Sequence, residues 1–201
     1  IVGGSVAVTY SGSITDNTGF AVDIDNHDSG NLTFSGNITS TGFGIRVQQC
    51  GGGTKTFSGS SKSLTVTTNT AVTLSSNTGA TINFSNGGLV INTTSGTGFS
   101  ATGGGTVTVQ GTGNSITTTA AKALNLDGVL ANLNFATISA GNVPSEGINL
   151  NNLSASSSLV VPGAVTIGMA VGSNANVNIS GCSNCTIDLG TNGTTHNAVN
   201  L

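Results

Sequence analysis

The feature that most constrains the fold is an alternating apolar pair that returns about every 25 residues. Successive pairs are separated by 23, 27, 27, 25, 24, 21 and 30 residues. A repeat of this length is typical of a solenoid, in which each repeat forms one structural unit that stacks on the next. The pairs are Val22/Ile24, Ile45/Val47, Val72/Leu74, Phe99/Ala101, Leu124/Leu126, Ile148/Leu150, Met169/Val171 and Val199/Leu201.

Each period contains three short strand-like segments. In one period these segments carry Val72/Leu74, Ile82/Phe84 and Leu89/Ile91. Alternation sends one side chain inward and the next outward, and Gly, Asn and Ser between the segments suit corners with left-handed backbone. We therefore predict an all-β fold, a right-handed-type parallel β-helix (β-solenoid) of about eight three-strand turns. The predicted core is Val22, Ile24, Phe34, Ile45, Val47, Phe57, Val72, Leu74, Phe84, Leu124, Leu126, Phe135, Ile148 and Leu150.

The composition agrees with stacked parallel strands. Charged residues make up 5% of the 201 residues, whereas about 25% is usual in soluble domains. In a solenoid, like charges would stack every ~4.8 Å and repel one another, while Thr, Ser and Asn can form hydrogen-bonded ladders. The four basic residues, within a net charge of −3, give no basic patch for nucleic acid. No run of 18 apolar residues occurs either, so we expect no membrane insertion.

One stretch resembles a known family. Residues 81–109, TINFSNGGLVINTTSGTGFSATGGGTVTV, are similar to the repeats of large secreted bacterial β-strand-repeat surface proteins. The resemblance extends over roughly residues 15–155. It implies an adhesin-like parallel β-helix on the bacterial cell surface, and it brings no catalytic residues with it.

The ends of the repeat predict a role in assembly. Val6, Val8 and Tyr10 begin the ladder almost at once, and Val199 and Leu201 lie in a predicted inward-facing strand. Uncapped strand edges are templates for further pairing. The single domain, residues 1–201, is therefore either a segment of a longer solenoid or a subunit that binds further copies of itself head to tail. We favour the second interpretation, with these five residues as the interface.

The densest acidic region is a candidate calcium site. Asp23, Asp25 and Asp28 could supply the oxygen ligands that Ca²⁺ prefers. The spacing lacks the glycine and glutamate of an EF-hand loop, and it lacks the glycine-rich repeat of calcium-binding β-rolls. A solvated outer face and corner is the favoured interpretation, so no cofactor is expected.

Enzymatic activity is not expected. Polysaccharide-cleaving β-helix enzymes need paired carboxylates, or carboxylates with basic residues on adjacent turns. Asp23 and Asp25, one turn from Arg46, are the best such group, and Asp127, Glu146 and Asp188 are scattered singly. The expected function is not enzymatic, and a polysaccharide-degrading or carbohydrate-binding β-helix protein is kept only as the alternative.

Ice binding is a further alternative. Thr-x-Thr motifs occur at Thr54/Thr56, Thr65/Thr67 and Thr106/Thr108. They do not recur at a constant place in the repeat, and the turn length varies, whereas a flat lattice-matched face needs uniform turns. We therefore expect no ice-binding face.

The three cysteines indicate the compartment. Cys182 and Cys185 are three residues apart and form a candidate local disulfide, with two free thiols as the alternative, while Cys50 stands alone. A disulfide favours a secreted location. The expected function is that of a structural extracellular rod, either a filament subunit or an adhesin stalk assembling end to end.

Overall fold

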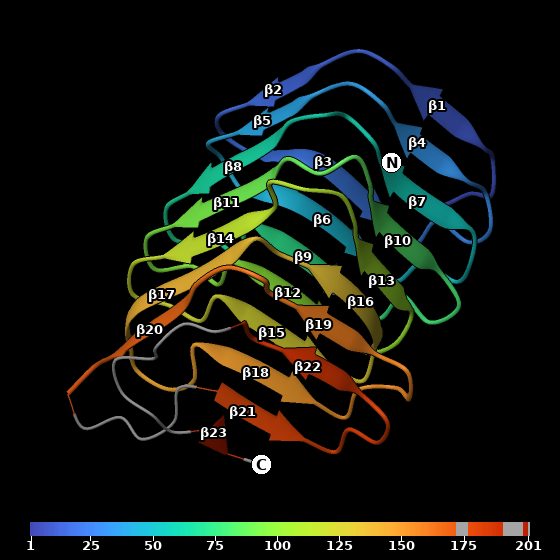
Figure 1. Ribbon diagram of the computed structural model, residues 1–201. Helices are drawn as coiled ribbons and strands as arrows, with labels where there is room; N and C mark the ends of the chain where they lie inside the picture. Colours follow the sequence, from blue (N-terminus) through green and yellow to red (C-terminus); the bar gives the residue numbers. More distant parts are fainter. Residues whose placement is uncertain (172–176, 191–198, 201) are drawn as a thin grey trace.

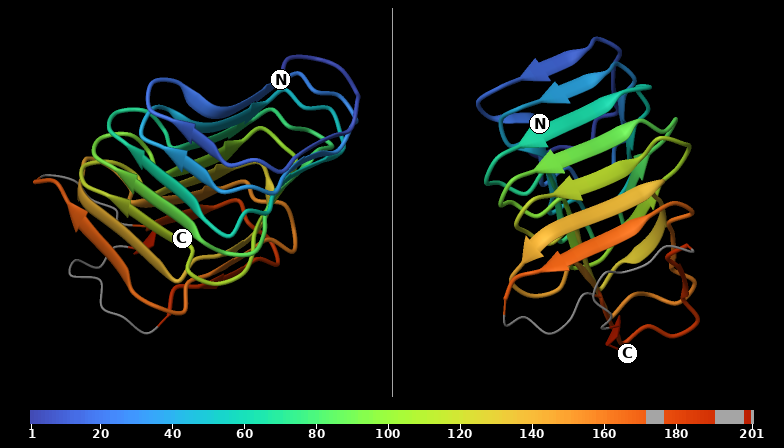
Figure 2. Two further views of the ribbon diagram at one scale, coloured as in Figure 1. Left: turned by 90° about the horizontal axis from the view of Figure 1, so that it is seen from above. Right: turned by 60° about the vertical axis from the view of Figure 1, so that its left-hand side comes forward.

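The computed structural model of the chain describes residues 1–171, 177–190 and 199–200, the last two as backbone only. It is a parallel β-solenoid in which three sheets run along the axis (Figures 1 and 2). Each turn contributes one strand to each sheet in the same order, and all strand pairs are parallel. The fold class is therefore as predicted. No helix of the described residues is long and apolar enough to cross a membrane.

The strands of the three sheets follow one another in rotation along the chain. Sheet 1 contains β1 (Val8–Tyr10), β4 (Leu32–Phe34), β7 (Thr54–Phe57), β10 (Thr81–Phe84), β13 (Thr106–Val109), β16 (Leu130–Asn134), β19 (Ser158–Val160) and β22 (Thr186–Asp188). Sheet 2 contains β2 (Ile14–Asp16), β5 (Ile38–Ser40), β8 (Lys62–Val66), β11 (Leu89–Thr93), β14 (Ser115–Thr118), β17 (Thr137–Val143) and β20 (Val165–Met169). Sheet 3 contains β3 (Phe20–Asp25), β6 (Gly44–Gln48), β9 (Val72–Ser75), β12 (Phe99–Thr102), β15 (Leu124–Asp127), β18 (Ile148–Asn151), β21 (Val177–Ser180) and β23 (Val199–Asn200).

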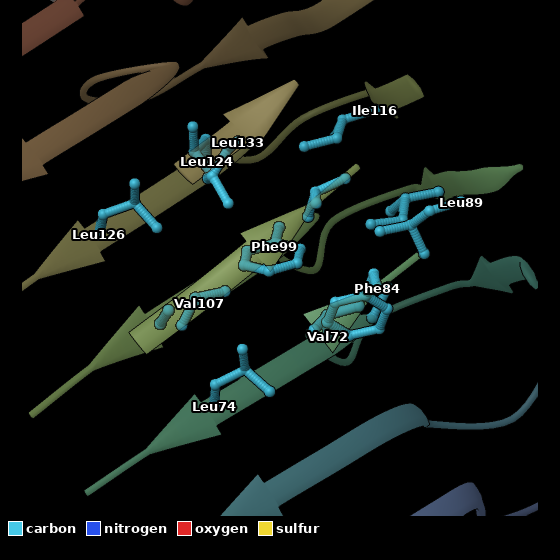
Figure 3. Close-up of a cluster of buried hydrophobic side chains, with 14 of the residues drawn as sticks. Val72, Leu74, Phe84, Leu89, Phe99, Val107, Ile116, Leu124, Leu126 and Leu133 are labelled. Atoms are coloured by element: carbon cyan, nitrogen blue, oxygen red, sulfur yellow. The ribbon is translucent and has the colours of Figure 1, made fainter. Parts of the chain in front are cut away.

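Apolar side chains from the three sheets meet in one continuous core (Figure 3). All fourteen residues of the predicted core are buried. In sheet 1, the ring of Phe57 is stacked between Phe34 and Phe84, with ring centroids 5.3 and 4.8 Å apart. The edge of Phe99, from sheet 3, meets the Phe84 ring at 5.8 Å. Each turn therefore buries its apolar side chains mainly against the turns above and below it.

One predicted repeat pair is wrong. Met169 lies at the end of β20 in sheet 2, where it pairs with Val143, and Val171 is fully exposed. The strand that continues sheet 3 after Ile148 is β21, beginning at Val177. The chain between β20 and β21 is longer than the other connections from sheet 2 to sheet 3, so the next alternating pair after the usual interval was not the one that continues sheet 3.

Turns differ in length because their corners contain different numbers of residues. Along one sheet 3 column, from Val22 to Val199, successive residues are 23, 27, 27, 25, 24, 29 and 22 apart in sequence. The ladder nevertheless stays in register. At the start of β6, Gly44 has φ +82°, and a Cβ there would lie 2.0 Å from Ala71 O. Only glycine can therefore occupy this corner, because both the left-handed backbone and the neighbouring turn exclude a side chain.

Candidate functional site

The three acidic residues proposed for calcium do not form a cluster of ligands. Both carboxylate oxygens of Asp23 accept hydrogen bonds from Arg46, at 2.8 Å each. Within the described residues, no three His, Cys, Asp or Glu side chains are grouped as metal ligands. This geometry does not favour calcium binding through Asp23, Asp25 and Asp28, which stays an alternative.

The Arg46–Asp23 pair forms a clamp across the first two turns. The Arg46 guanidinium also lies over the Phe20 ring, 4.5 Å from its centroid, and Phe20 packs edge-on against Phe43. Hydrogen bonds from Arg46 lower the pKa of Asp23, so the carboxylate keeps its charge. The polysaccharide-cleaving arrangement considered from the sequence needs a carboxylate open to substrate. Here the guanidinium occupies both oxygens of Asp23.

Two lysines point into the core, a feature that the sequence analysis missed. Lys55 and Lys62 have no exposed surface. Lys62 is held between Ile38 and Leu89 in one column of sheet 2. Their position could have been recognised from the alternation, because Lys55 lies two residues before the inward-facing Phe57. Their charge made them look like surface residues.

Each buried ammonium group bridges neighbouring turns by donating to backbone carbonyls. Lys62 Nζ donates to Gly59 O at 2.5 Å, Ser85 O at 3.0 Å and Gly87 O at 2.7 Å. Three donors therefore meet three acceptors. Lys55 Nζ likewise donates to the carbonyl oxygens of His27, Gly30 and Gly52. All six carbonyls lie in corners outside the strands, and the two lysines donate hydrogen bonds to them.

Lys62 is expected to make stability depend on alkaline pH. Burial lowers its pKa from 10.5 to about 8. Between these values the unfolded chain retains a proton that the folded chain has released, so raising the pH favours the folded state. The difference in unfolding free energy between the wild type and Lys62→Met should therefore be constant below pH 8 and should grow from pH 8 to 10.5. Denaturant titrations across this range measure it, and a constant difference throughout would contradict the prediction.

A polar corner lies directly under the N-terminal segment. His27 is buried, and its Nε2 is 3.1 Å from Val6 O. Cys50 is buried beside it, and burial raises the pKa of its thiol. Among the described residues, His27 Nδ1 and one oxygen of Asp25 lack a hydrogen-bond partner. The corner therefore anchors the N-terminal segment, and its thiol is shielded from solvent.

The other two cysteines are joined. Cys182 and Cys185 form a disulfide with Cα atoms 6.0 Å apart, in the corner between β21 and β22. In a chain-entropy description, closing a loop this short stabilises the fold by about 2 kcal/mol. The disulfide therefore holds one corner next to the last strand of sheet 1.

Two of the three Thr-x-Thr motifs lie in the same columns of sheet 1 and the third begins on sheet 2, so, as expected, the motifs do not recur at one place in every turn. On sheet 1, Thr54/Thr56 and Thr106/Thr108 lie in the same two columns, with Thr81/Asn83 between them. On sheet 2, Thr65 continues the column of Asn92 and Thr117. The unequal corners conceal this alignment in the sequence. The outward column of sheet 1 is unbroken and consists of Thr9, Thr33, Thr56, Asn83, Thr108, Asn132, Ser158 and Thr186.

Polar side chains bond to one another along these outer faces. On sheet 3, Asn149 donates to Asn125 at 2.9 Å, and Asn178 donates to Asn149 at 2.8 Å. On sheet 1, the Thr108 hydroxyl donates to Asn83 at 2.6 Å. Such ladders add neutral hydrogen bonds between turns without placing like charges close together.

Exposed apolar side chains are concentrated at the N-terminal end of the solenoid. Val6, Val8 and Tyr10 are 72%, 41% and 46% exposed. Val8 and Tyr10 occupy the same inward-facing columns as Leu32 and Phe34, which are buried one turn further on. Val8 and Tyr10 are therefore core positions that no described strand covers, whereas Val6 lies before β1. Of the predicted C-terminal ones, Val199 is described only as backbone in β23, and Leu201 lies outside the described residues.

Comparison of the chain with protein-family models, with curated proteins and with solved structures finds no match. The geometry of the chain itself is therefore the basis for a functional assignment.

Proposed function

We propose that this chain is a structural protein, an extracellular β-solenoid rod that serves as a filament subunit or adhesin stalk and extends end to end. The observation that carries the proposal is the combination of three unbroken parallel sheets with open strand edges. On the N-terminal side, β1 and β2 each pair with only one strand among the described residues. Proteins normally cover or disrupt the edges of their sheets, because an open edge is a template for another strand.

The inventory of side chains supports a mechanical role. In the described part of the chain, all four basic side chains bond to other groups of the solenoid. Arg46 pairs with Asp23, Lys122 pairs with Glu146 at 3.1 Å, and the two other lysines bridge turns inside the core. These charged side chains therefore serve to join neighbouring turns of the ladder.

Two features support the extracellular location. The disulfide between Cys182 and Cys185 is of a kind that persists in oxidising compartments. The repeats resemble those of secreted β-strand-repeat surface proteins in residues 81–109, which cover parts of β10 to β13. Both features favour a secreted protein at the bacterial cell surface.

End-to-end growth is expected when the purified chain is concentrated. Analytical ultracentrifugation over a range of concentrations should show a series of species that lengthens with concentration, because each added rod offers a new open edge. Electron microscopy should show unbranched chains one rod wide. A monomer at every concentration in both measurements would refute the proposal.

A second candidate function, binding of ice, is favoured by the aligned outer faces. A shallow groove of about 200 Å³ on sheet 2 is lined mainly by threonines from three turns. The Thr-x-Thr motifs do not recur in every turn, so this candidate rests on the threonine-lined groove and on the continuous outward column of sheet 1. A thermal hysteresis assay distinguishes this function from that of a rod. The rod remains our conclusion, because one core extends along the whole described solenoid and the strand edges of β1 and β2 are open.

A further inference from the structure

We infer that a groove on the outer face of sheet 2 binds a single chain of an uncharged, extended polysaccharide. This inference goes beyond the proposed function, because it assigns a ligand to one side of the rod and does not depend on assembly. The groove has a volume of about 200 Å³ and crosses β8, β11 and β14. These strands belong to the stack that faces the viewer in the right-hand view of Figure 2. The outward-facing residues that line it, called the groove residues below, are Thr65, Thr67, Asn92, Thr94, Thr117 and Thr119.

The groove runs along the axis of the solenoid, because the same two positions of three successive turns line it. One row consists of Thr65, Asn92 and Thr117, and the other consists of Thr67, Thr94 and Thr119. Backbone hydrogen bonds hold the second row in step with the ladder. Ser95 N donates to Thr67 O at 2.9 Å, and Ala120 N donates to Thr94 O at 2.8 Å. Members of a row are therefore ~4.8 Å apart, and the two rows are ~6.6 Å apart.

The polar groups of the groove residues are not used within the protein. On the outer faces of sheets 1 and 3, polar side chains bond to one another, as Thr108 does to Asn83 and Asn149 does to Asn125. Among the described residues, no such bond joins the side chain of a groove residue to another group of the protein. All five groove threonines are exposed. Their hydroxyl groups are therefore left for solvent or for a ligand.

The inward-facing threonines of the same strands show the contrast. The Thr93 hydroxyl donates to Gly96 O, and the Thr118 hydroxyl donates to Ala121 O. These two residues are buried and hold the corners between sheets 2 and 3. Threonines on the two sides of the sheet therefore have different roles, and only the outward ones can contact another molecule.

The chemistry of the groove matches that of sugar hydroxyl groups. Threonine hydroxyl and asparagine amide groups both donate and accept hydrogen bonds, as sugar hydroxyls do. An extended polysaccharide carries hydroxyl groups along both edges of its chain, so a chain lying in the groove presents one edge to each row. Because the sugar units repeat along the chain and the groove residues repeat along the axis, weak contacts in several turns act together.

Other classes of ligand fit the groove less well. None of the groove residues is charged, so nothing there attracts an acidic polysaccharide or a nucleic acid. An extended peptide usually adds to the edge of a sheet through its backbone, whereas this face offers side chains. An ice surface is flat, and Val90 and Asn92 interrupt the hydroxyl-bearing columns of sheet 2. The groove therefore fits a single neutral chain better than a crystal surface.

The test is a titration of the ¹⁵N-labelled chain with cellohexaose, a neutral β-1,4-linked hexasaccharide, followed by nuclear magnetic resonance. Hexagalacturonate is the acidic counterpart. The double variant Thr65→Val/Thr117→Val removes two hydroxyl groups from one row and keeps β-branched side chains of the same shape. The matched control is Thr33→Val/Thr56→Val, which makes the same change in the outward column of sheet 1. Circular dichroism establishes that both double variants are folded.

Cellohexaose should shift the amide resonances of the groove residues in the wild type and in the control. It should bind the Thr65→Val/Thr117→Val variant about tenfold more weakly, as expected for two lost hydrogen bonds. No binding by the wild type, equal binding by the groove variant, or a preference for hexagalacturonate would each overturn the inference. Thermal hysteresis that is lost in the groove variant, with no binding of cellohexaose, would assign this face to ice instead. None of these results bears on end-to-end assembly, which ultracentrifugation tests separately.

Discussion

Replacing Lys62 by Met is expected to lower the free energy of unfolding at pH 7 by about 3–5 kcal/mol. Methionine fills a similar volume but donates no hydrogen bond. The carbonyl oxygens of Gly59, Ser85 and Gly87 would lose their ammonium partner inside the protein. Replacing a buried ion pair by apolar residues can be harmless when both partners are removed. Here the acceptors belong to the backbone and cannot be removed.

Denaturant titration followed by circular dichroism measures this effect, and Lys122→Met is the matched control. Lys122 pairs with Glu146 near the surface, so its loss should change the unfolding free energy by less than about 1 kcal/mol. Equal stability of the two variants would show that the three carbonyls find other donors when Lys62 is removed.

Replacing Phe57 by Ala is expected to destabilise the solenoid by about 3–5 kcal/mol. The ring has no exposed surface and is stacked between Phe34 and Phe84. Its removal opens a cavity in the middle of the aromatic column, and the parallel strands on either side cannot close it without losing register. The effect should appear as a lower midpoint of thermal and denaturant unfolding.

Phe43→Ala is the control for this prediction. Phe43 is 40% exposed at the outer surface and contacts Phe20 only edge-on. Its replacement should change the unfolding free energy by less than about 1 kcal/mol. If both phenylalanines had the same effect, the aromatic column would not be the element that joins neighbouring turns.

The unfolding of either variant also tests how far the turns are coupled. In a solenoid, stability is approximately a sum of terms within each repeat and between nearest neighbours. Lys62 and Phe57 lie in adjacent strands of the same turn, β8 and β7. Their effects are therefore expected to be less than additive in the double variant, since either change already weakens the same interface.

The candidate calcium site shows that closeness in sequence did not predict which side chains are neighbours in the fold. Asp23, Asp25 and Asp28 are close in sequence, which suggested a common ligand set. In a solenoid the nearest neighbours of a side chain lie one turn away, about 25 residues along the chain. The neighbour of Asp23 is therefore Arg46, and this contact decides what the carboxylate does.

The sequence by itself determined the architecture of this protein. Alternation sets which side chains face inward, and the 25-residue period sets how many strands fit in one turn, so both follow from local spacing. The tertiary structure alone decided which residues of successive turns lie side by side, because corners of unequal length break the link between sequence distance and position along the axis. That alignment placed two lysines against corner carbonyls and formed the continuous outward column of threonine, asparagine and serine on sheet 1.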